Sequence, residues 1–386
     1  MQWSIIIILL SASAIHAALP KQYPIDTNIT DIGIKFLQYL PDNNASNIAF
    51  SPLGLYLTLA FLHMGSRSNT AGEVTRVTGS TDPDPQVVLY SAKPLIYQIR
   101  DEAKPHKFEM ANAILLKSDI PTKLWFLQQL TDPNIKATQR NISEYAQVEV
   151  NRWAKAITNG SISVLIEKPL ASNATIHIFN AIFFSGHWRE KFDPRTTKEE
   201  SFYNADKTVS KRQLMKKEET FLSAYDADLD ADAVIIPYSG SLVKFCLIVP
   251  RSKYGAVRVK NNLTSAKFHH LLSNMKPQRI DLYLPKFTLE ASYDLKDFFW
   301  KLKVRRVFTV YSNSMGFSMK PNIPVSGVTH KSSMVVDDYG GQPWEPSPTE
   351  APPPQALVVK ADHAFLFFVT AGKRNAPIYA GLINKL

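Results

Sequence analysis

The chain has 386 residues, 45% hydrophobic and 11% aromatic, which is enough for a large core and excludes an intrinsically disordered polypeptide. Lysine and arginine number 44 against 34 aspartates and glutamates, a formal charge of +10. Scattered surface charge accounts for this excess, and an anionic partner such as a glycosaminoglycan or a membrane surface is the alternative.

The first predicted element is a secretory signal peptide at residues 1–17, with an apolar core followed by small residues. It is too short to span a membrane, and we expect no membrane insertion of the mature chain. Six N-x-[ST] sequons follow and favour a secreted, extracellular glycoprotein. They lie at Asn28, Asn44, Asn141, Asn159, Asn173 and Asn262.

Helical periodicity marks four segments of the remaining chain. Residues 25–40 carry apolar side chains at helical spacing. Residues 51–66 begin with Ser51 as a cap and Pro52 as the first helical position, and the helix is apolar all round, which places it inside a large domain. Residues 145–160 end at Gly160, a C-cap candidate. Residues 291–304 show the same periodicity.

Apolar strand patterns cover residues 108–117, 174–188, 233–240, 242–250 and 279–287. Several are apolar on both faces, which indicates a central sheet covered by other layers. The only cysteine, Cys246, falls in such a run, so we expect a buried, inert thiol and no internal disulfide. Helices come first and strands dominate later, which favours an α+β fold in one domain, residues 18–386.

Motifs of the common enzyme and metal classes are absent from the sequence. His177 lies in a buried-strand pattern and is expected to be a hydrogen-bonded core histidine. Ser51 suits a helix cap better than a nucleophile. We therefore expect no catalytic residue, no metal, no cofactor, no nucleic-acid binding and no enzyme activity.

A basic cluster lies at Lys301, Lys303, Arg305 and Arg306. We expect Lys301, Lys303 and Arg305 to share one side of a helix end, where positive charge is ordinary electrostatics. The alternative is an anion patch that binds a glycosaminoglycan.

Taken together, these segments resemble the serpin family over essentially the whole mature chain. The similar runs occur in the family's order: NIAFSPLGLYLTLAFLHMGSRSNT, FEMANAILL, VNRWAKAITNGSI, FNAIFFSGHWREKF, IIPYSGSLVKFCLIVP, YLPKFTLEASYDLK, VTHKSS and KADHAFLFFV. The resemblance implies a serpin fold with three β-sheets, about eight or nine helices and an exposed reactive-centre loop at about residues 338–358. In that family the loop is bait for a serine or cysteine protease and inserts into the main sheet after cleavage.

The resemblance also implies roles for residues around the sheet opening. Ser51, Asn180 and His330 match the shutter, and Trp188 matches the breach tryptophan. The family's second shutter serine falls on Gly54. Ser185 and Ala364 also depart from the family pattern.

The loop hinge begins as the family's does and then departs from it. Asp338 and Gly340 fit, whereas the family's run of small residues is replaced by Gly341, Pro343, Glu345 and Pro346, with Pro348 beyond them. Proline has no N–H for a ladder, and an inward Glu345 would bury an unpaired carboxylate. The usual spacing places the reactive bond at Pro354–Gln355.

We therefore expect a secreted, monomeric serpin-fold protein that does not inhibit by loop insertion and acts as a binding, carrier or signalling module. Its partner would be an extracellular protein. The alternative is an extracellular serine or cysteine protease inhibitor that uses the 338–358 loop as bait.

Overall fold

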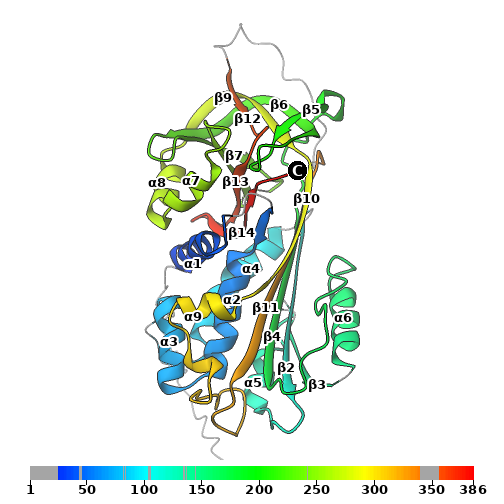
Figure 1. The fold of residues 1–386 in the computed structure, drawn as a ribbon, viewed down its shortest axis with the longest axis vertical. Helices are drawn as coiled ribbons and strands as arrows, with labels where there is room; N and C mark the ends of the chain where they lie inside the picture. The colour runs from blue at the N-terminus through cyan, green and yellow to red at the C-terminus, as the bar shows by residue number, and fades with distance from the viewer. Residues whose placement is uncertain are drawn as a thin grey trace, which may run out of the picture.

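The computed structural model describes residues 25–42, 46–80, 82, 84–102, 106–133, 135, 137–143, 145–240, 242–339 and 356–386. The signal segment 1–17, Asn44 and the loop residues 340–355 lie outside these ranges. Figure 1 shows an elongated molecule, with a long sheet at one end and a curved sheet network at the other.

The described residues form nine α-helices: α1 (Ile25–Tyr39), α2 (Pro52–Gly65), α3 (Ser68–Thr78), α4 (Val87–Glu102), α5 (Leu124–Gln129), α6 (Ala146–Ile157), α7 (Ala256–Asn262), α8 (Ser265–Ser273) and α9 (Lys296–Lys301). Helix α2 begins as the sequence predicts, because the Ser51 side chain accepts a hydrogen bond from Gly54 N and Pro52 occupies the first turn. Every residue of α2 is buried, and the helix contacts α1, α4, β4 and β11.

A five-stranded sheet has the order β10 (Phe287–Asp294), β11 (Val325–Val336), β4 (Ile176–Ser185), β2 (Lys107–Lys117) and β3 (Ala137–Ile142). It is the long sheet of Figure 1, with α2 against one face and α6 against the other. Buried side chains of α6, β2 and β4 form a second, smaller core on the α6 side. Both faces are therefore covered, as the apolar strand patterns predict.

The other strands form a nine-stranded network: β1 (Ile48–Phe50), β5 (Lys198–Tyr203), β6 (Val209–Asp226), β7 (Ala231–Pro237), β8 (Lys244–Pro250), β9 (Lys276–Pro285), β12 (Leu357–Lys360), β13 (Phe365–Ala371) and β14 (Ala376–Ile383). Strand β6 runs for 18 residues and divides the network. Residues 209–214 pair with β5, residues 214–223 with β9, and residues 222–226 with β7. The small sheet β5–β6–β9–β12 is thus the third sheet, and the α+β, three-sheet prediction is confirmed.

One helix prediction is wrong in part. Residues 291–294 belong to β10, because they pair antiparallel with β11, and only Lys296–Lys301 of the segment is helical. Helix α6 ends at Ile157, and Gly160 follows in the left-handed region with φ +82° while its N–H reaches Lys155 O. Within the described residues, no helix combines the length and apolarity needed to cross a membrane.

Candidate functional site

The candidate site is the seam between β4 and β11 at the centre of the five-stranded sheet. The two strands are parallel and paired from Ile176 with Val325 to Ser185 with Val335. They lie side by side along the sheet in Figure 1. A strand inserted between them must first separate this ladder, so the groups that hold the two strands together decide whether the sheet opens.

A buried chain of hydrogen bonds crosses the seam. His330 Nε2 accepts from Ser51 N at 2.9 Å, and His330 Nδ1 lies 2.8 Å from Asn180 Oδ1. Because Nε2 accepts, the neutral ring carries its proton on Nδ1 and donates it to Asn180. Asn180 Nδ2 donates to Asn112 Oδ1 at 2.6 Å, and Asn112 Nδ2 donates to Ile135 O at 2.6 Å. The chain therefore ties α2, β11, β4 and β2 together.

Burial lowers the pKa of His330 to about 3, so the ring stays neutral at any physiological pH. The structure thus brings the three residues of the predicted shutter, Ser51, Asn180 and His330, into one contact network. It adds Asn112, which sequence reasoning missed. An asparagine inside the apolar run FEMANAILL was the available signal, because a buried amide needs partners.

Gly54 lies against this network. A Cβ atom on Gly54 would lie 2.4 Å from Asn180 Oδ1 and 2.7 Å from His330 Cε1. The Ser51 hydroxyl meanwhile donates to Ile378 O at 2.6 Å and accepts from Gly54 N at 2.9 Å. Asn180 and His330 therefore occupy the space that a serine side chain at position 54 would need.

The upper end of the seam is held by Trp188, which is 1% exposed. Its indole Nε1 donates to Asp337 O at 2.6 Å, and its backbone N–H donates to Tyr339 O at 3.1 Å. The ring stacks on Tyr238 with centroids 4.4 Å apart. Trp188, three residues after the end of β4, thus fixes the segment that leaves β11 toward the loop.

The start of the hinge is also held by an ion pair. Asp338 Oδ2 lies 2.6 Å from Nζ of Lys286, which is located between β9 and β10. The Asp338 side chain is 12% exposed. Sequence reasoning missed Lys286, because nothing local links the two residues. The other predicted loop residues lie outside the described residues and remain predictions: Gly340, Gly341, Pro343, Glu345, Pro346, Pro354 and Gln355.

The basic cluster after α9 does not have the expected arrangement. Helix α9 ends at Lys301, so Arg305 and Arg306 lie beyond it and not on its last turn. Their backbone N–H groups donate to Glu73 Oε2 at 2.7 and 2.8 Å, and Arg306 Nε lies 3.7 Å from Glu73 Oε1. This carboxylate offsets part of the positive charge and weakens the anion-patch alternative.

Cys246, which is buried, and His177, which is half-buried, both behave as structural residues. Cys246 is fully buried, and burial raises the pKa of its thiol to about 12, so the inert-thiol prediction is confirmed. His177 Nε2 lies 2.9 Å from Thr329 Oγ1, and the ring stacks on Phe179, which confirms a hydrogen-bonded histidine. Burial lowers its pKa to about 4.

The sequons differ in accessibility. Asn28 lies within α1, where its side-chain amide donates to Thr78 O at 2.7 Å, and Thr30 of the same sequon is fully buried. This geometry disfavours a sugar at Asn28. Four other sequon asparagines are exposed: Asn141, Asn159, Asn173 and Asn262.

The family model described as "Serpin (serine protease inhibitor)" matches residues 27–386. The chain is 27% identical to Iripin-8 of Ixodes ricinus over 370 residues, which cover 92% of each chain. It is 31% identical to the plasma serine protease inhibitor of Bos taurus over 304 residues, covering 77% of this chain and 74% of that protein.

Two solved structures share its fold. Native protease nexin-1 with heparin superposes with a TM-score of 0.84 at 22% identity, covering 94% of this chain and 99% of that one. Human thyroxine-binding globulin complexed with thyroxine gives a TM-score of 0.81 at 20% identity, with the same two coverages.

Proposed function

The chain belongs to the serpin family, and from this premise we propose that it is a secreted serpin that does not inhibit proteases by loop insertion. It acts instead as a binding, carrier or signalling module for an extracellular partner. The proposal assigns no catalytic chemistry to the chain. Thyroxine-binding globulin, a solved protein of the same fold, offers a precedent for a carrier.

The observation that carries the proposal is the proline content of the segment that would insert. Pro343, Pro346 and Pro348 follow the hinge and have no N–H to give to a central strand. By analogy with helix interiors each costs roughly 3 kcal/mol, and three cost on the order of 9. Inhibition is a race between insertion and hydrolysis of the acyl-enzyme, so slow insertion turns the loop into a substrate.

A charged residue in the segment that would insert is a second objection to loop insertion. Strand alternation places Gly341, Pro343 and Glu345 on one face of an inserted strand. Both faces of the five-stranded sheet are covered, by α2 and by α6. Glu345 would therefore bury a carboxylate, for which the sequence supplies no evident partner.

The alternative is an inhibitor of an extracellular serine or cysteine protease that presents Pro354–Gln355 as its reactive bond. The bovine relative, named a plasma serine protease inhibitor, favours this alternative. Glycosaminoglycan binding by the basic cluster stays a weaker proposal, since Glu73 contacts both arginines.

The deciding experiment is a single cut in the loop. A glutamyl-specific protease can cut Glu350–Ala351, whereas Pro346 protects the bond after Glu345. We expect the melting temperature of the cut protein, verified by mass spectrometry, to stay within a few degrees of that of the intact protein. A large upward shift would show that the loop inserts and would contradict the proposal.

The matched variant carries Pro343→Ala, Glu345→Ala, Pro346→Ala and Pro348→Ala. After the same cut we expect its melting temperature to rise sharply, because the loop can then donate along the whole ladder. No rise would mean that the prolines are not the obstacle. A protease complex that survives a denaturing gel with the natural chain would favour the inhibitor alternative.

A further inference from the structure

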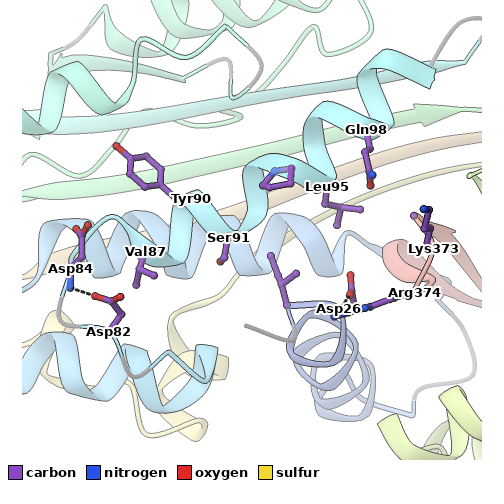
Figure 2. A pocket seen from close by; sticks show the side chains of 13 residues that line it. Asp26, Asp82, Asp84, Val87, Tyr90, Ser91, Leu95, Gln98, Lys373 and Arg374 are labelled. Atoms are coloured by element: carbon purple, nitrogen blue, oxygen red, sulfur yellow. Dashed lines mark hydrogen bonds and ion pairs between the residues drawn. The ribbon is translucent and has the colours of Figure 1, made fainter. Parts of the chain in front are cut away.

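A pocket of about 450 Å³ lies between the first turn of α1, one face of α4 and the turn that joins β13 to β14 (Figure 2). Ligand pockets in proteins commonly span roughly 300–1,000 Å³. None of the residues of the β4–β11 seam or the hinge lines this pocket. The pocket is therefore separate from the seam and from the hinge.

The wall of the pocket supplied by α4 is largely apolar. Val87 and Leu95 are buried, at 7% and 6% exposure, and Pro94 lies between them on the same helix face. Tyr90 is 42% exposed, and its ring points away from Val87 and Leu95 in Figure 2. Pro94 has no backbone N–H, so at this position α4 presents an apolar ring to the pocket and no hydrogen-bond donor. These side chains suit a flat, apolar ligand body.

Asp26 supplies the charge at one end of the pocket. Its side chain is 16% exposed, whereas its ion-pair partner Arg374 is 60% exposed and its guanidinium stands 3.7 Å away. Burial raises the pKa of Asp26, although the Arg374 guanidinium acts to lower it. Figure 2 shows Asp26 and Arg374 directed toward one another across this end.

The opposite end of the pocket is also acidic. Asp82 and Asp84 each accept one backbone N–H at 2.8 Å, from Asp84 and Gln86, in the turn that leads into α4. With Asp26 they place three carboxylates around the pocket, against the two cations Lys373 and Arg374. Counted over the whole lining, a cationic ligand faces more opposite charge than like charge, although both cations stand at the Asp26 end, where they are exposed to solvent.

We propose that this pocket binds a small organic cation with an aromatic, apolar body. The ammonium group lies at Asp26, and the body lies along Val87, Pro94 and Leu95. The inference gives the carrier part of the proposed function a ligand class, and in that respect it rests on the proposed function.

Two probes of similar shape and opposite charge test the charge preference. Tryptamine and indole-3-propionate share the indole ring and a two-carbon arm, and differ in the charge at its end. By isothermal titration at low salt, we expect tryptamine to bind at least about tenfold more tightly, a difference of about 1.4 kcal/mol. Equal binding, no binding of tryptamine, or preference for the propionate overturns the proposal.

Three variants locate the binding. Asp26→Asn keeps the shape of the side chain, removes the charge and should weaken tryptamine about tenfold or more. Arg374→Gln removes the competing cation and should strengthen tryptamine binding. Asp31→Asn is the matched control, because it removes one carboxylate from the same helix at a side chain that pairs with Lys35 outside the pocket. Equal effects of Asp26→Asn and Asp31→Asn would overturn the assignment.

The two proposals can fail separately. A large rise in melting temperature after the loop cut would reject the proposed function while tryptamine still binds. Absence of tryptamine binding would reject the pocket assignment while the cut protein stays at its original melting temperature.

Discussion

The β4–β11 seam and the α1–α4 pocket both place polar groups below the surface, but with opposite outcomes. In the seam, His330, Asn180 and Asn112 hydrogen-bond one another and the backbone, and the ring is neutral. In the pocket, the carboxylate of Asp26 is largely buried with its cation at 3.7 Å. The hydrogen-bonded groups of the seam need no further partner and stabilise the closed sheet. The Asp26 carboxylate beside the cavity can still gain from a ligand of opposite charge.

The largest expected effect comes from breaking the chain in the seam. His330→Ala leaves Ser51 N–H and Asn180 Oδ1 without partners in a buried site and adds a cavity. We expect a loss of about 3 kcal/mol or more in the free energy of unfolding, measured as a fall in melting temperature. The control is His270→Ala at an exposed histidine of α8, which should stay within about 0.5 kcal/mol of the natural chain. Similar effects at both sites would show that the seam chain is not stabilising.

The second effect is the pH dependence of the free energy of unfolding. The contribution from the seam and that from the pocket have opposite signs. The pKa of His330 is about 3 in the folded chain, and the usual value near 6.5 applies when unfolded. The unfolded state therefore binds more protons between these values, so stability is complete above about pH 6.5 and falls as the pH decreases toward 3. At pH 4.5, two units below the unfolded pKa, the loss from His330 is about 2.7 kcal/mol.

The His177 pKa, about 4, acts in the same direction. Asp26 changes stability in the other direction. Its pKa is raised in the folded chain, so its protonation at low pH relieves the cost of its burial and favours the folded state. Arg374 and His269 are the basic groups that face it. Melting temperatures from pH 7.5 to 4.5 check both signs. Asp26→Asn should make the acid-induced loss steeper, and a shallower loss would contradict the assignment.

The third effect tests close packing in the seam. Gly54→Ala places a methyl group 2.4 Å from Asn180 Oδ1 and should cost about 1 to 3 kcal/mol. Gly72→Ala is the matched control in α3, since nothing lies within 4 Å of its Cβ position, and it should gain up to about 1 kcal/mol. Chemical denaturation of the two variants compares them directly, and a neutral Gly54→Ala would mean that the shutter relaxes freely.

The sequence predicted those elements whose causes are local. Ser51 and Pro52 mark the start of α2, and apolar runs mark the buried strands. The segment 291–294 was misassigned because its residues fit helical spacing and also alternate as β10 does, and pairing with β11 decides between the two. Local periodicity alone cannot resolve such a case.

The site was predictable only where the family pattern named its residues. Folding brings together Ser51, Asn180 and His330, and the family resemblance predicted all three. The contact of Asp338 with Lys286 and the convergence of Asp26, α4 and Arg374 depend on distant segments that meet only in the fold. No sequence motif marks such meetings, so the pocket could not have been predicted.

The backbone N–H of Trp188 donates to Tyr339 O, at the point where β11 gives way to the loop. Amide protons exchange with solvent only when their hydrogen bond opens. The deuterium uptake of this one amide therefore counts how often the hinge leaves the top of the seam. It does so in the resting molecule, without a protease or a cut.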